Sequence, residues 1–267
     1  MPPEKLPKGA IRIKKMTVEI IKGSKRISYA AHRLGAMGLA YRSMLLLPIP
    51  TTKDGINVNG TDITLDSLIG GMDGSCVVAG YGLPGEFCER VRALGGVVYD
   101  ALYDESFQQK NAELTALGAI GELISERDRA PSEVRFGIIG YGRIGSALLK
   151  YLSFLGAHPV VFSARESVRL MLGEWGVECS AGEALEDFLG LDVLINTAPR
   201  CITDMAGAEL LYASGMSIFD LASGENFGGS ERVVRLPAVP DRVFPESAGA
   251  AYADAICEYL KGISSLK

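Results

Sequence analysis

Two patterns of apolar residues alternate along the first half of the chain. Short apolar runs are typical of strands buried on both faces of a parallel sheet, and apolar residues at helical spacing are typical of amphipathic helices. The predicted strands are 17–21, 43–48, 76–79 and 97–99, with a small hairpin at 58–64, and the predicted helices are 24–37, 86–94 and 104–125. This alternation predicts a small parallel α/β unit of roughly 100 residues.

The same alternation resumes at Val134 and continues toward the end of the chain. The predicted strands are 134–139, 159–163, 177–180, 192–197, 217–221 and 242–244, and the predicted helices are 146–155, 167–175, 184–189, 206–213 and 247–261. This order is typical of a doubly wound Rossmann sheet, whose ligands bind beyond the carboxyl ends of the strands.

The predicted elements group into an α/β protein with two domains. We predict a smaller N-terminal parallel α/β domain over 1–126, whose last helix, at about 104–125, joins the two halves. A polar stretch containing a proline then leads into a Rossmann domain over 127–246. A C-terminal helix occupies 247–267, and packing back on the N-terminal domain is one option for it.

Three glycines follow the predicted strand at 134–139 with G-x-G-x-x-G spacing. Gly140 allows a tight turn, Gly142 lets the main chain approach a pyrophosphate, and Gly145 lets helix and strand pack closely. The phosphates would lie on N–H groups at the positive end of the helix. Because strand, glycines, helix and second strand come in the required order, we predict a dinucleotide site, with a βα turn that binds nothing as the alternative.

The end of the second Rossmann strand indicates which dinucleotide fits. An acidic residue there binds a ribose 2′-hydroxyl, whereas an arginine suits a 2′-phosphate. Here the strand leads into Ser163-Ala164-Arg165-Glu166-Ser167, and guanidinium groups form bidentate pairs with phosphate. We therefore expect NADP, with NAD as the alternative if Glu166 binds the ribose.

Polar residues also end the later Rossmann strands. Asn196 ends the fourth strand, and residues 220–223 end the fifth, so both lie where a nicotinamide ribose or an interdomain cleft is expected. Arg143, between the fingerprint glycines, is a candidate for binding the pyrophosphate. The two histidines, His32 and His158, lie outside the motifs, and we expect both to be structural.

Composition and charge argue against several other classes of protein. The net charge of -5 and the lack of a basic run with interleaved aromatics argue against a nucleic-acid groove. No apolar run reaches the roughly 18 residues that a membrane span needs, and the first residues lack the apolar core of a signal peptide. Five scattered cysteines without a C-x-x-C pair suit reduced thiols, and two histidines give little support for a metal centre. We expect a cytoplasmic protein.

Several segments resemble the dipicolinate synthase A-subunit family, the dehydrogenase-like component of the enzyme that makes dipicolinate in spore-forming bacteria. In the second domain they are Gly-Tyr-Gly-Arg-Ile-Gly at 140–145, Ser-Ala-Arg-Glu-Ser at 163–167, Asp-Val-Leu-Ile-Asn-Thr-Ala-Pro at 192–199 and Ile-Phe-Asp-Leu-Ala-Ser at 218–223. Leu-Leu-Pro-Ile-Pro at 46–50 and Gly-Tyr-Gly-Leu at 80–83 are similar in the first half. The wider group is the formate/glycerate (D-2-hydroxyacid) dehydrogenase-type Rossmann proteins, in which two α/β domains enclose a cleft.

The resemblance also implies which residues form the site. An NADP site would be lined by Gly140, Gly142, Arg143, Gly145, Ser163, Arg165, Thr197 and Ala222, and their neighbours Tyr141, Ile144, Ala164, Ala198, Pro199 and Leu221 complete the candidate set. A small dicarboxylate would face Thr51, Thr52, Gly80, Tyr81 and Gly82.

Two positions depart from the family pattern. Gly224 and Glu246 stand where the family tends to carry cationic residues, so two groups that would hold an anionic substrate are missing. A D-2-hydroxyacid dehydrogenase has a histidine near position 246 to shuttle the proton. Glu246 is either an acid or base in its place or an ordinary loop carboxylate. Together with Asn196 and Ser223, it makes up the set of candidate catalytic residues.

The resemblance implies an NAD(P)-dependent oxidoreductase that transfers a hydride to or from a small dicarboxylate in an interdomain cleft. Two alternatives stay open: a D-2-hydroxyacid-type dehydrogenase with another substrate, and a non-catalytic NADP-binding sensor or partner subunit. Small residues on the linker helix and the C-terminal helix suit either a homo-oligomer or an internal domain contact.

Overall fold

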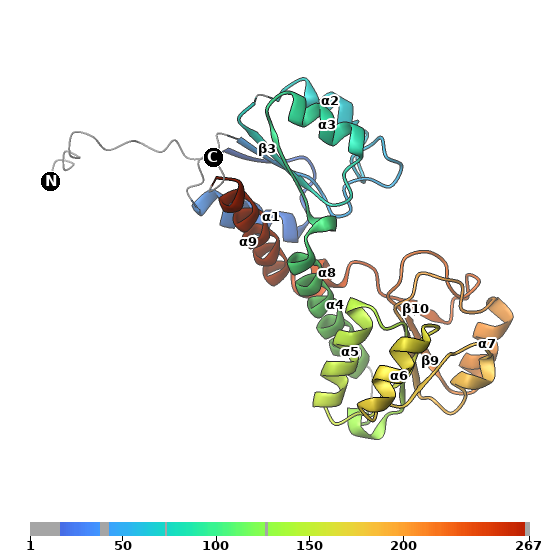
Figure 1. Cartoon of the computed structure of the whole chain (residues 1–267). Helices are drawn as coiled ribbons and strands as arrows, with labels where there is room; N and C mark the ends of the chain where they lie inside the picture. Colours follow the sequence, from blue (N-terminus) through green and yellow to red (C-terminus); the bar gives the residue numbers. More distant parts are fainter. Residues whose placement is uncertain (1–16, 38–42, 73, 126–127, 265–267) are drawn as a thin grey trace. The chain divides into compact units, whose positions relative to one another are not determined.

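The computed structural model describes residues 17–37, 43–72, 74–125 and 128–264, which form two compact units (Figure 1). Unit 1 combines the described residues up to Gln108 with those from Pro245 onward, and unit 2 runs from Gln109 to Phe244. The division falls inside helix α4 (Glu105–Ser125), whose later residues join the core of unit 2. The boundary expected at 126–127 lies outside the described residues.

Unit 1 is built on a sheet of four parallel strands that follow one another in sequence order. The strands are β1 (Thr17–Ile20), β2 (Ser43–Leu46), β3 (Cys76–Gly80) and β4 (Val97–Asp100). The connecting helices are α1 (Lys25–Ala36), α2 (Leu65–Ile69) and α3 (Gly85–Ala93), and a 3-10 turn, η1 (Ala101–Tyr103), follows the last strand. The predicted parallel α/β fold of the N-terminal half is confirmed.

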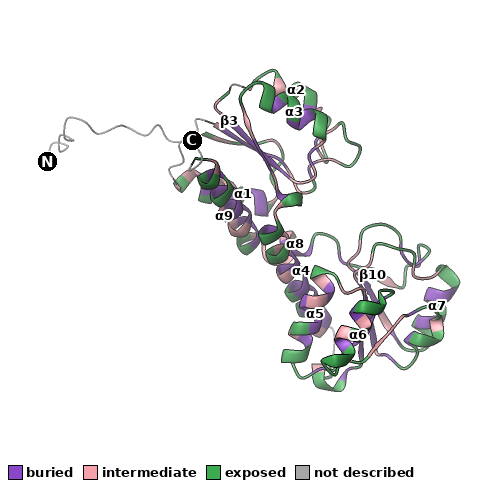
Figure 2. Cartoon of the chain, in the orientation of Figure 1, coloured by how far each residue is buried: buried purple, intermediate pink, exposed green. Residues whose placement is uncertain are grey.

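Helices cover both faces of this sheet. Alternate residues of a strand point to opposite faces, so Met44 and Leu46 pack with α1 and α9 (Pro245–Ser264), whereas Leu45 packs with α2 and α3. Strand β3 is buried at every residue (Figure 2). Burial on both faces explains why these strands are short continuous apolar runs in the sequence.

Helix α9 packs against α1 within unit 1. A Cβ on Gly249 would lie 2.6 Å from the carbonyl oxygen of Arg26 and 2.7 Å from the Cβ of Tyr29, so the close approach of the two helices requires glycine. Arg33 donates to both carboxylate oxygens of Asp254, at 2.8 and 3.0 Å, and this hydrogen-bonded pairing raises the pKa of the guanidinium. The small residues of α9 therefore serve an internal contact.

Unit 2 is built on six parallel strands in the order β10-β9-β8-β5-β6-β7. They are β5 (Phe136–Ile139), β6 (Val160–Phe162), β7 (Cys179–Ser180), β8 (Val193–Asn196), β9 (Ser217–Asp220) and β10 (Val233–Arg235). The strand order reverses between β5 and β8, which places the topological switch point, where such sheets bind ligands, at the carboxyl end of β5. The predicted doubly wound Rossmann sheet is confirmed.

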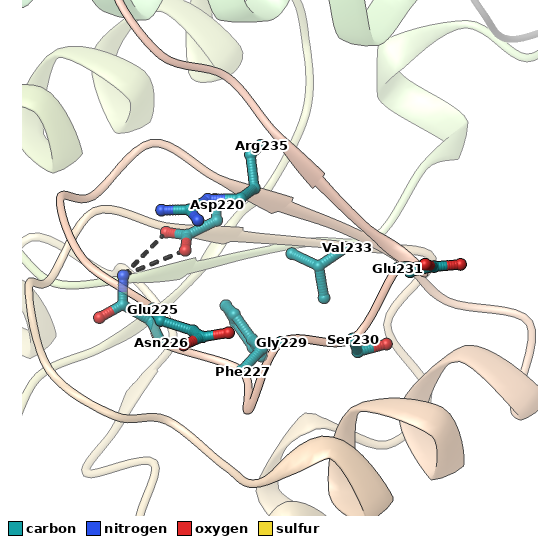
Figure 3. A pocket seen from close by; sticks show the side chains of 9 residues that line it. All are labelled: Asp220, Glu225, Asn226, Phe227, Gly229, Ser230, Glu231, Val233 and Arg235. Carbon is teal, nitrogen blue, oxygen red and sulfur yellow. Dashed lines mark hydrogen bonds between the residues drawn. The ribbon is translucent and has the colours of Figure 1, made fainter.

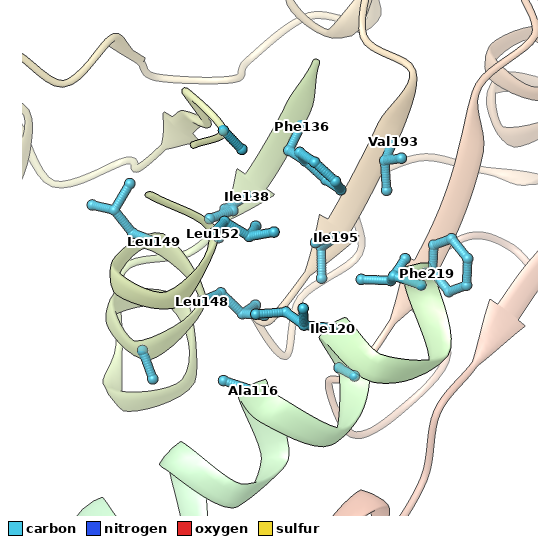
Figure 4. Close-up of a cluster of buried hydrophobic side chains, with 14 of the residues drawn as sticks. Ala116, Ile120, Phe136, Ile138, Leu148, Leu149, Leu152, Val193, Ile195 and Phe219 are labelled. Carbon is cyan, nitrogen blue, oxygen red and sulfur yellow. The ribbon is translucent and has the colours of Figure 1, made fainter. Parts of the chain in front are cut away.

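Two hydrophobic clusters join the helices of unit 2 to the two faces of its sheet. On one face lie α4, α5 (Arg143–Phe154), α6 (Glu166–Glu174) and α8 (Val239–Val243), and on the other lie α7 (Met205–Ala213) and the 3-10 turn η3 (Leu185–Phe188). A further 3-10 turn, η2 (Pro131–Glu133), precedes β5. Figure 4 shows Ile120 of α4 and Leu148 of α5 in one cluster with Ile195 of β8. Within the described ranges, every helix is too short or too polar to cross a membrane.

Three predicted elements differ from the structure. The strand predicted at 242–244 is wrong, because α8 ends there and the last strand is β10. Strand β10 lies at the sheet edge with Val234 and Arg235 exposed, so it carries no buried apolar run that the sequence pattern would reveal. The helix predicted at 184–189 is the 3-10 turn η3. The hairpin predicted at 58–64 is reduced to one antiparallel bridge between Asn57 and Thr64.

Candidate functional site

The chain turns sharply where β5 ends. Gly140 has a φ of +92°, a backbone conformation that favours glycine. Its N–H donates to the carbonyl oxygen of Phe162 at 2.8 Å. A Cβ on Gly140 would also lie 2.8 Å from the Oγ1 of Thr197. Both the conformation and this close contact require glycine at the first position of the motif.

The third glycine of the motif lets α5 pack against this turn. A Cβ on Gly145 would overlap the carbonyl oxygen of Gly140. Helix α5 begins at Arg143, earlier than the predicted start at Ser146, with Gly142 as its N-cap. The first turn of the helix therefore lies directly beside the end of β5.

The second glycine leaves open space at the start of α5. A Cβ on Gly142 would meet none of the described atoms within 4 Å, and no side chain of the described residues caps the helix. Helices α1, α2 and α7 are capped by Ser24, Thr64 and Asp204, whereas α3 and α6, like α5, have no side-chain cap among the described residues. The first N–H groups of a helix lack intrahelical acceptors. An anion above Gly142 would therefore meet N–H groups and the positive end of the helix dipole.

A cavity of about 270 Å³ lies at the same edge of the sheet. Three segments line it: the turn after β5, the end of β6 with the loop that follows, and the loop after β8. The predicted cofactor-binding residues that line it are Gly140, Tyr141, Gly142, Ser163, Ala164, Arg165, Thr197, Ala198 and Pro199. The structure thus brings together segments that are far apart in the sequence. We call this space the nucleotide cavity, after the ligand that its glycine turn predicts.

The remaining predicted cofactor residues lie outside the lining of the nucleotide cavity. Arg143 and Ile144 form the first turn of α5, and Gly145 is buried beneath it. Leu221 and Ala222 follow β9, where the Ala222 N–H donates to Asp220.

Sequence reasoning missed three residues of the cavity lining. Ile139 and Phe162 are the last residues of β5 and β6, and Arg200 follows Pro199 in the loop after β8. Their positions gave a usable signal, because residues at the carboxyl ends of adjacent parallel strands border the ligand site of this fold. Arg200 adds an exposed cation to the lining.

Two arginines organise the part of the cavity that follows β6. Arg165 donates from Nη2 to the carbonyl oxygen of Tyr141 at 2.8 Å, and its N–H donates to the Oγ of Ser163 at 3.4 Å. Arg169 donates from Nη1 to the carbonyl oxygen of Ser163 at 2.7 Å. Arg165 therefore links the glycine turn, through its exposed guanidinium, to the end of β6, through its main-chain N–H. Partial burial raises the pKa of the Tyr141 phenol.

The candidate catalytic residues lie in different settings. Asn196 is completely buried at the end of β8, where its side-chain amide bonds to Ala198 and Asp220. Ser223 is exposed in the loop after β9. Both belong to unit 2. Glu246 is exposed in the first turn of α9 in unit 1, where it lines a cavity of about 410 Å³ together with His32 of α1.

The predicted substrate residues form a tightly bonded loop pair in unit 1. Thr51 is completely buried, and its Oγ1 donates to the carbonyl oxygen of Pro48 at 3.2 Å and accepts the Tyr81 N–H at 2.8 Å. A Cβ on Gly80 would lie 2.5 Å from the same oxygen. Thr51 therefore holds the loops after β2 and β3 together, and its hydroxyl is engaged inside the protein.

Carboxylates hold the rest of these loops. Asp100, at the end of β4, accepts the N–H groups of Gly82 and Leu83, each at 2.8 Å. Asp54 accepts the main-chain N–H and the side-chain amide of Asn57, and these bonds hold the pKa of its carboxyl well below the ordinary value. The Oγ1 of Thr52 donates to Asp54 at 3.1 Å. Among the described residues, no three His, Cys, Asp or Glu side chains are grouped as a metal site.

Comparisons with known proteins agree with this geometry at the level of the fold. No protein-family model matches the chain, and no curated protein matches it. The A subunit of dipicolinate synthase from Bacillus halodurans superposes with a TM-score of 0.73 at 20% identity, over 93% of this chain and 98% of that chain. The A chain of dipicolinate synthase from Bacillus subtilis gives a TM-score of 0.72 at 17% identity, over 95% and 98% of the two chains.

A more distant structure has the same two-domain plan. D-lactate dehydrogenase from Escherichia coli superposes with a TM-score of 0.56 at 15% identity, over 95% of this chain and 98% of that chain. The chain therefore has the fold of the two-domain Rossmann dehydrogenases, and the predicted likeness to the A subunit of dipicolinate synthase is confirmed as a likeness of fold.

Proposed function

We propose that the chain is an NAD(P)-dependent oxidoreductase similar to the A subunit of dipicolinate synthase. The observation that carries this proposal is the start of α5, where a helix without a side-chain cap among the described residues opens onto unfilled space above Gly142. A pyrophosphate there would accept hydrogen bonds from N–H groups that have no acceptor within the helix.

The nucleotide cavity favours NADP over NAD. The 2′-phosphate of NADP would lie at the end of β6, where Ser163 is buried and Arg165 is exposed at the cavity. A guanidinium binds phosphate through two parallel N–H bonds. The first turn of α5, with Arg143, would hold the pyrophosphate, and the loop after β8 would border the nicotinamide ribose.

The proposed reaction is hydride transfer to or from a small dicarboxylate. Bound nicotinamide would supply or accept the hydride, and Glu246 is the proposed acid or base for the accompanying proton. Exclusion of water from the bound substrate would favour the transfer. A D-2-hydroxyacid-type dehydrogenase is a weaker alternative, because Glu246 stands where its histidine is expected.

A non-catalytic nucleotide-binding protein is the second candidate function. Gly224 and Glu246 stand where cationic residues are expected to hold an anionic substrate. A chain that keeps the nucleotide cavity without those cations would bind NADP as a sensor or as a partner subunit.

Titration with NADP and NAD tests the proposed cofactor. We expect Arg165→Ala to weaken NADP binding about tenfold or more and to leave NAD binding unchanged, because a charge-assisted pair with phosphate is lost. Arg135→Ala is the matched control, since Arg135 is an exposed arginine of unit 2 that pairs with Glu178 at 3.1 Å. Equal losses for NADP and NAD in Arg165→Ala would contradict the assignment of the 2′-phosphate.

Kinetics separates the enzyme from the binding protein. Both would show a melting temperature that rises with NADPH concentration, because a ligand that binds the folded state stabilises it. Only the enzyme would oxidise NADPH when small dicarboxylates are supplied. Binding without oxidation by any dicarboxylate tested would favour the sensor or partner subunit.

A further inference from the structure

A buried side chain holds the main chain of the nucleotide cavity at Ala198. The Oδ1 of Asn196 accepts the Ala198 N–H at 3.0 Å, and its Nδ2 donates to the Ala198 carbonyl oxygen at 3.1 Å. Asn196 is completely buried, and Ala198 lines the cavity. The amide thus binds both main-chain groups of one residue in the lining.

Asp220, at the end of the neighbouring strand β9, fixes the orientation of this amide. Its Oδ1 accepts the Nδ2 of Asn196 at 2.9 Å. A carboxylate without a proton only accepts hydrogen bonds, so it requires the N–H side of the amide to face it. The opposite side, Oδ1, then faces the Ala198 N–H. Asp220 therefore selects the amide orientation that Ala198 needs.

The other bonds of Asp220 explain why its own position is fixed. It is only 3% exposed, and it accepts the Ala222 N–H at 3.1 Å and the Asn226 side-chain amide at 3.0 Å. Figure 3 shows the two bonds between Asn226 and the Asp220 carboxylate, whose oxygens both accept. A buried carboxylate with several N–H donors is rigid, because loss of any bond leaves a polar group unsatisfied.

We propose that Asp220 is a positioning residue for the nucleotide cavity, acting through Asn196 on the main chain of Ala198. This inference rests on the proposed nucleotide function, and it gives Asn196 a positioning role in place of the catalytic role expected from its strand-end position. Asp220 itself is absent from the cavity lining, so its effect on nucleotide binding would be transmitted through the buried amide.

Asp220→Asn is the sharpest variant, because it keeps the shape and replaces one acceptor oxygen by an NH₂ group. That group would face the N–H donors of Asn196, Asn226 or Ala222. Where that group faces Asn196, the Asn196 amide loses its fixed orientation and its bonds to Ala198. Where it faces Asn226, the remaining oxygen still accepts from Asn196, so Asn196→Ala is the variant that removes the bonds to Ala198 in either arrangement. Asp192→Asn is the matched control: Asp192 also accepts a main-chain N–H, that of Arg135 at 2.8 Å, but it precedes β8 and so lies at the amino-terminal edge of the same sheet.

Two measurements on the whole chain test the proposal. In calorimetric titration with NADPH, we expect Asp220→Asn to raise Kd about tenfold or more, and Asp192→Asn to change it by less than about twofold. In hydrogen–deuterium exchange without nucleotide, we expect faster exchange of the Ala198 amide in Asp220→Asn and unchanged exchange in Asp192→Asn. Asn196→Ala, which leaves Asp220 bonded to Asn226, should reproduce both effects and replaces Asp220→Asn if that variant fails to fold.

The two measurements separate this inference from the proposed function. If the wild-type chain binds neither NADPH nor NADH, the proposed function fails, and exchange at Ala198 alone decides whether Asp220 positions this loop. Exchange at Ala198 that is unchanged in both Asp220→Asn and Asn196→Ala overturns the inference. So does an equal loss of NADPH affinity in Asp220→Asn and Asp192→Asn, because a general loss of stability would then explain both.

Discussion

The loops after β3 and β5 share one sequence pattern, Gly-Tyr-Gly-x-x-Gly, at 80–85 and at 140–145. Each follows the buried strand of a parallel sheet and leads into a helix. In unit 1 the loop is bonded to other parts of the same unit: Thr51 accepts the Tyr81 N–H, and Asp100 accepts the next two N–H groups. The second glycine faces open space in both loops: a Cβ on Gly82 would meet only the Cδ2 of Leu102, at 4.0 Å, and a Cβ on Gly142 would meet none of the described atoms within 4 Å.

The difference shows that the glycine spacing alone does not make a phosphate site. Asp100 occupies in unit 1 the role that a phosphate would have in unit 2, since a carboxylate and a phosphate are both anionic acceptors for main-chain N–H groups. The helix start differs as well. Helix α3 begins only at Gly85, after Pro84, whereas α5 begins at Arg143 and brings its first N–H groups beside the turn.

The largest expected effect is a loss of NADPH affinity when the open space over Gly142 in unit 2 is filled. Gly142→Ala places a Cβ where none of the described atoms lies within 4 Å, so the free energy of unfolding should stay nearly unchanged. The same Cβ would occupy the space of the pyrophosphate, and we expect Kd for NADPH to rise about 100-fold, or roughly 2.7 kcal/mol. Calorimetric titration and thermal melting check the two parts. Full retention of NADPH affinity would contradict the proposed phosphate position.

A change at the first glycine of the unit 1 loop, Gly80, which corresponds to Gly140, should have the opposite signature. A Cβ in Gly80→Ala would lie 2.5 Å from the Oγ1 of Thr51 and 2.8 Å from the Cδ2 of Leu83. We expect a loss of about 2 kcal/mol in the free energy of unfolding, because overpacking forces neighbours to move, and no change in Kd for NADPH. Denaturant unfolding, monitored by hydrogen–deuterium exchange mass spectrometry, assigns the loss of stability to unit 1. A large change in Kd would show that the two loops are not functionally distinct.

Removing the charge of Asp100, which binds the unit 1 loop, should lower the free energy of unfolding by a smaller amount. Asp100→Asn keeps one acceptor oxygen for the N–H groups of Gly82 and Leu83 and loses the other. We expect a loss of about 1.5 kcal/mol in the free energy of unfolding, with faster amide exchange at 81–83. Asp66→Asn, which changes an exposed aspartate of the same unit, is the control. Unchanged exchange at 81–83 would contradict the role given to Asp100.

The smallest expected effect is a change in how the stability of unit 1 depends on pH in the alkaline range. Burial, and a hydrogen bond donated to Asp104 at 2.8 Å, raise the pKa of the Tyr99 phenol, and complete burial raises that of Tyr252. The unfolded chain therefore releases these protons first as the pH rises past about 10, and the stability that the neutral phenols contribute to unit 1 decreases with further increase in pH. We expect Tyr99→Phe to make this decrease shallower in unfolding experiments between about pH 9 and pH 11. Tyr103→Phe, at a side chain that is 83% exposed, should leave it unchanged.

Much of the fold could be predicted from the sequence because it depends on local periodicity. The buried strands and the amphipathic helices, such as 136–139 and 25–36, repeat their apolar residues at the spacing of the element that they form. Strand β10 was missed for the converse reason: at the sheet edge, Val234 and Arg235 are exposed and leave no periodic signal.

The candidate site was predicted less completely, because its geometry depends on residues far apart in the chain. The segments 140–145, 163–165 and 197–199 were predicted from strand-end positions, and the cavity brings residues from all three together. The same rule suggested Asn196 as a catalytic residue. Its side-chain amide is instead buried and hydrogen-bonded to Asp220 and Ala198. Nothing in the sequence around Asn196 indicates that arrangement.

The sequence by itself determined most of the order of strands and helices, the Rossmann class of the second half and the position of the glycine turn after β5. Only the tertiary structure decided that Asp100 binds the Gly-Tyr-Gly loop of unit 1, where α9 packs, and which way the Asn196 amide is turned. The physical reason is that secondary structure follows from neighbours three or four residues away. An N–H group is occupied or available according to acceptors such as Thr51, 30 residues before Tyr81 in the chain, and folding alone brings such pairs together.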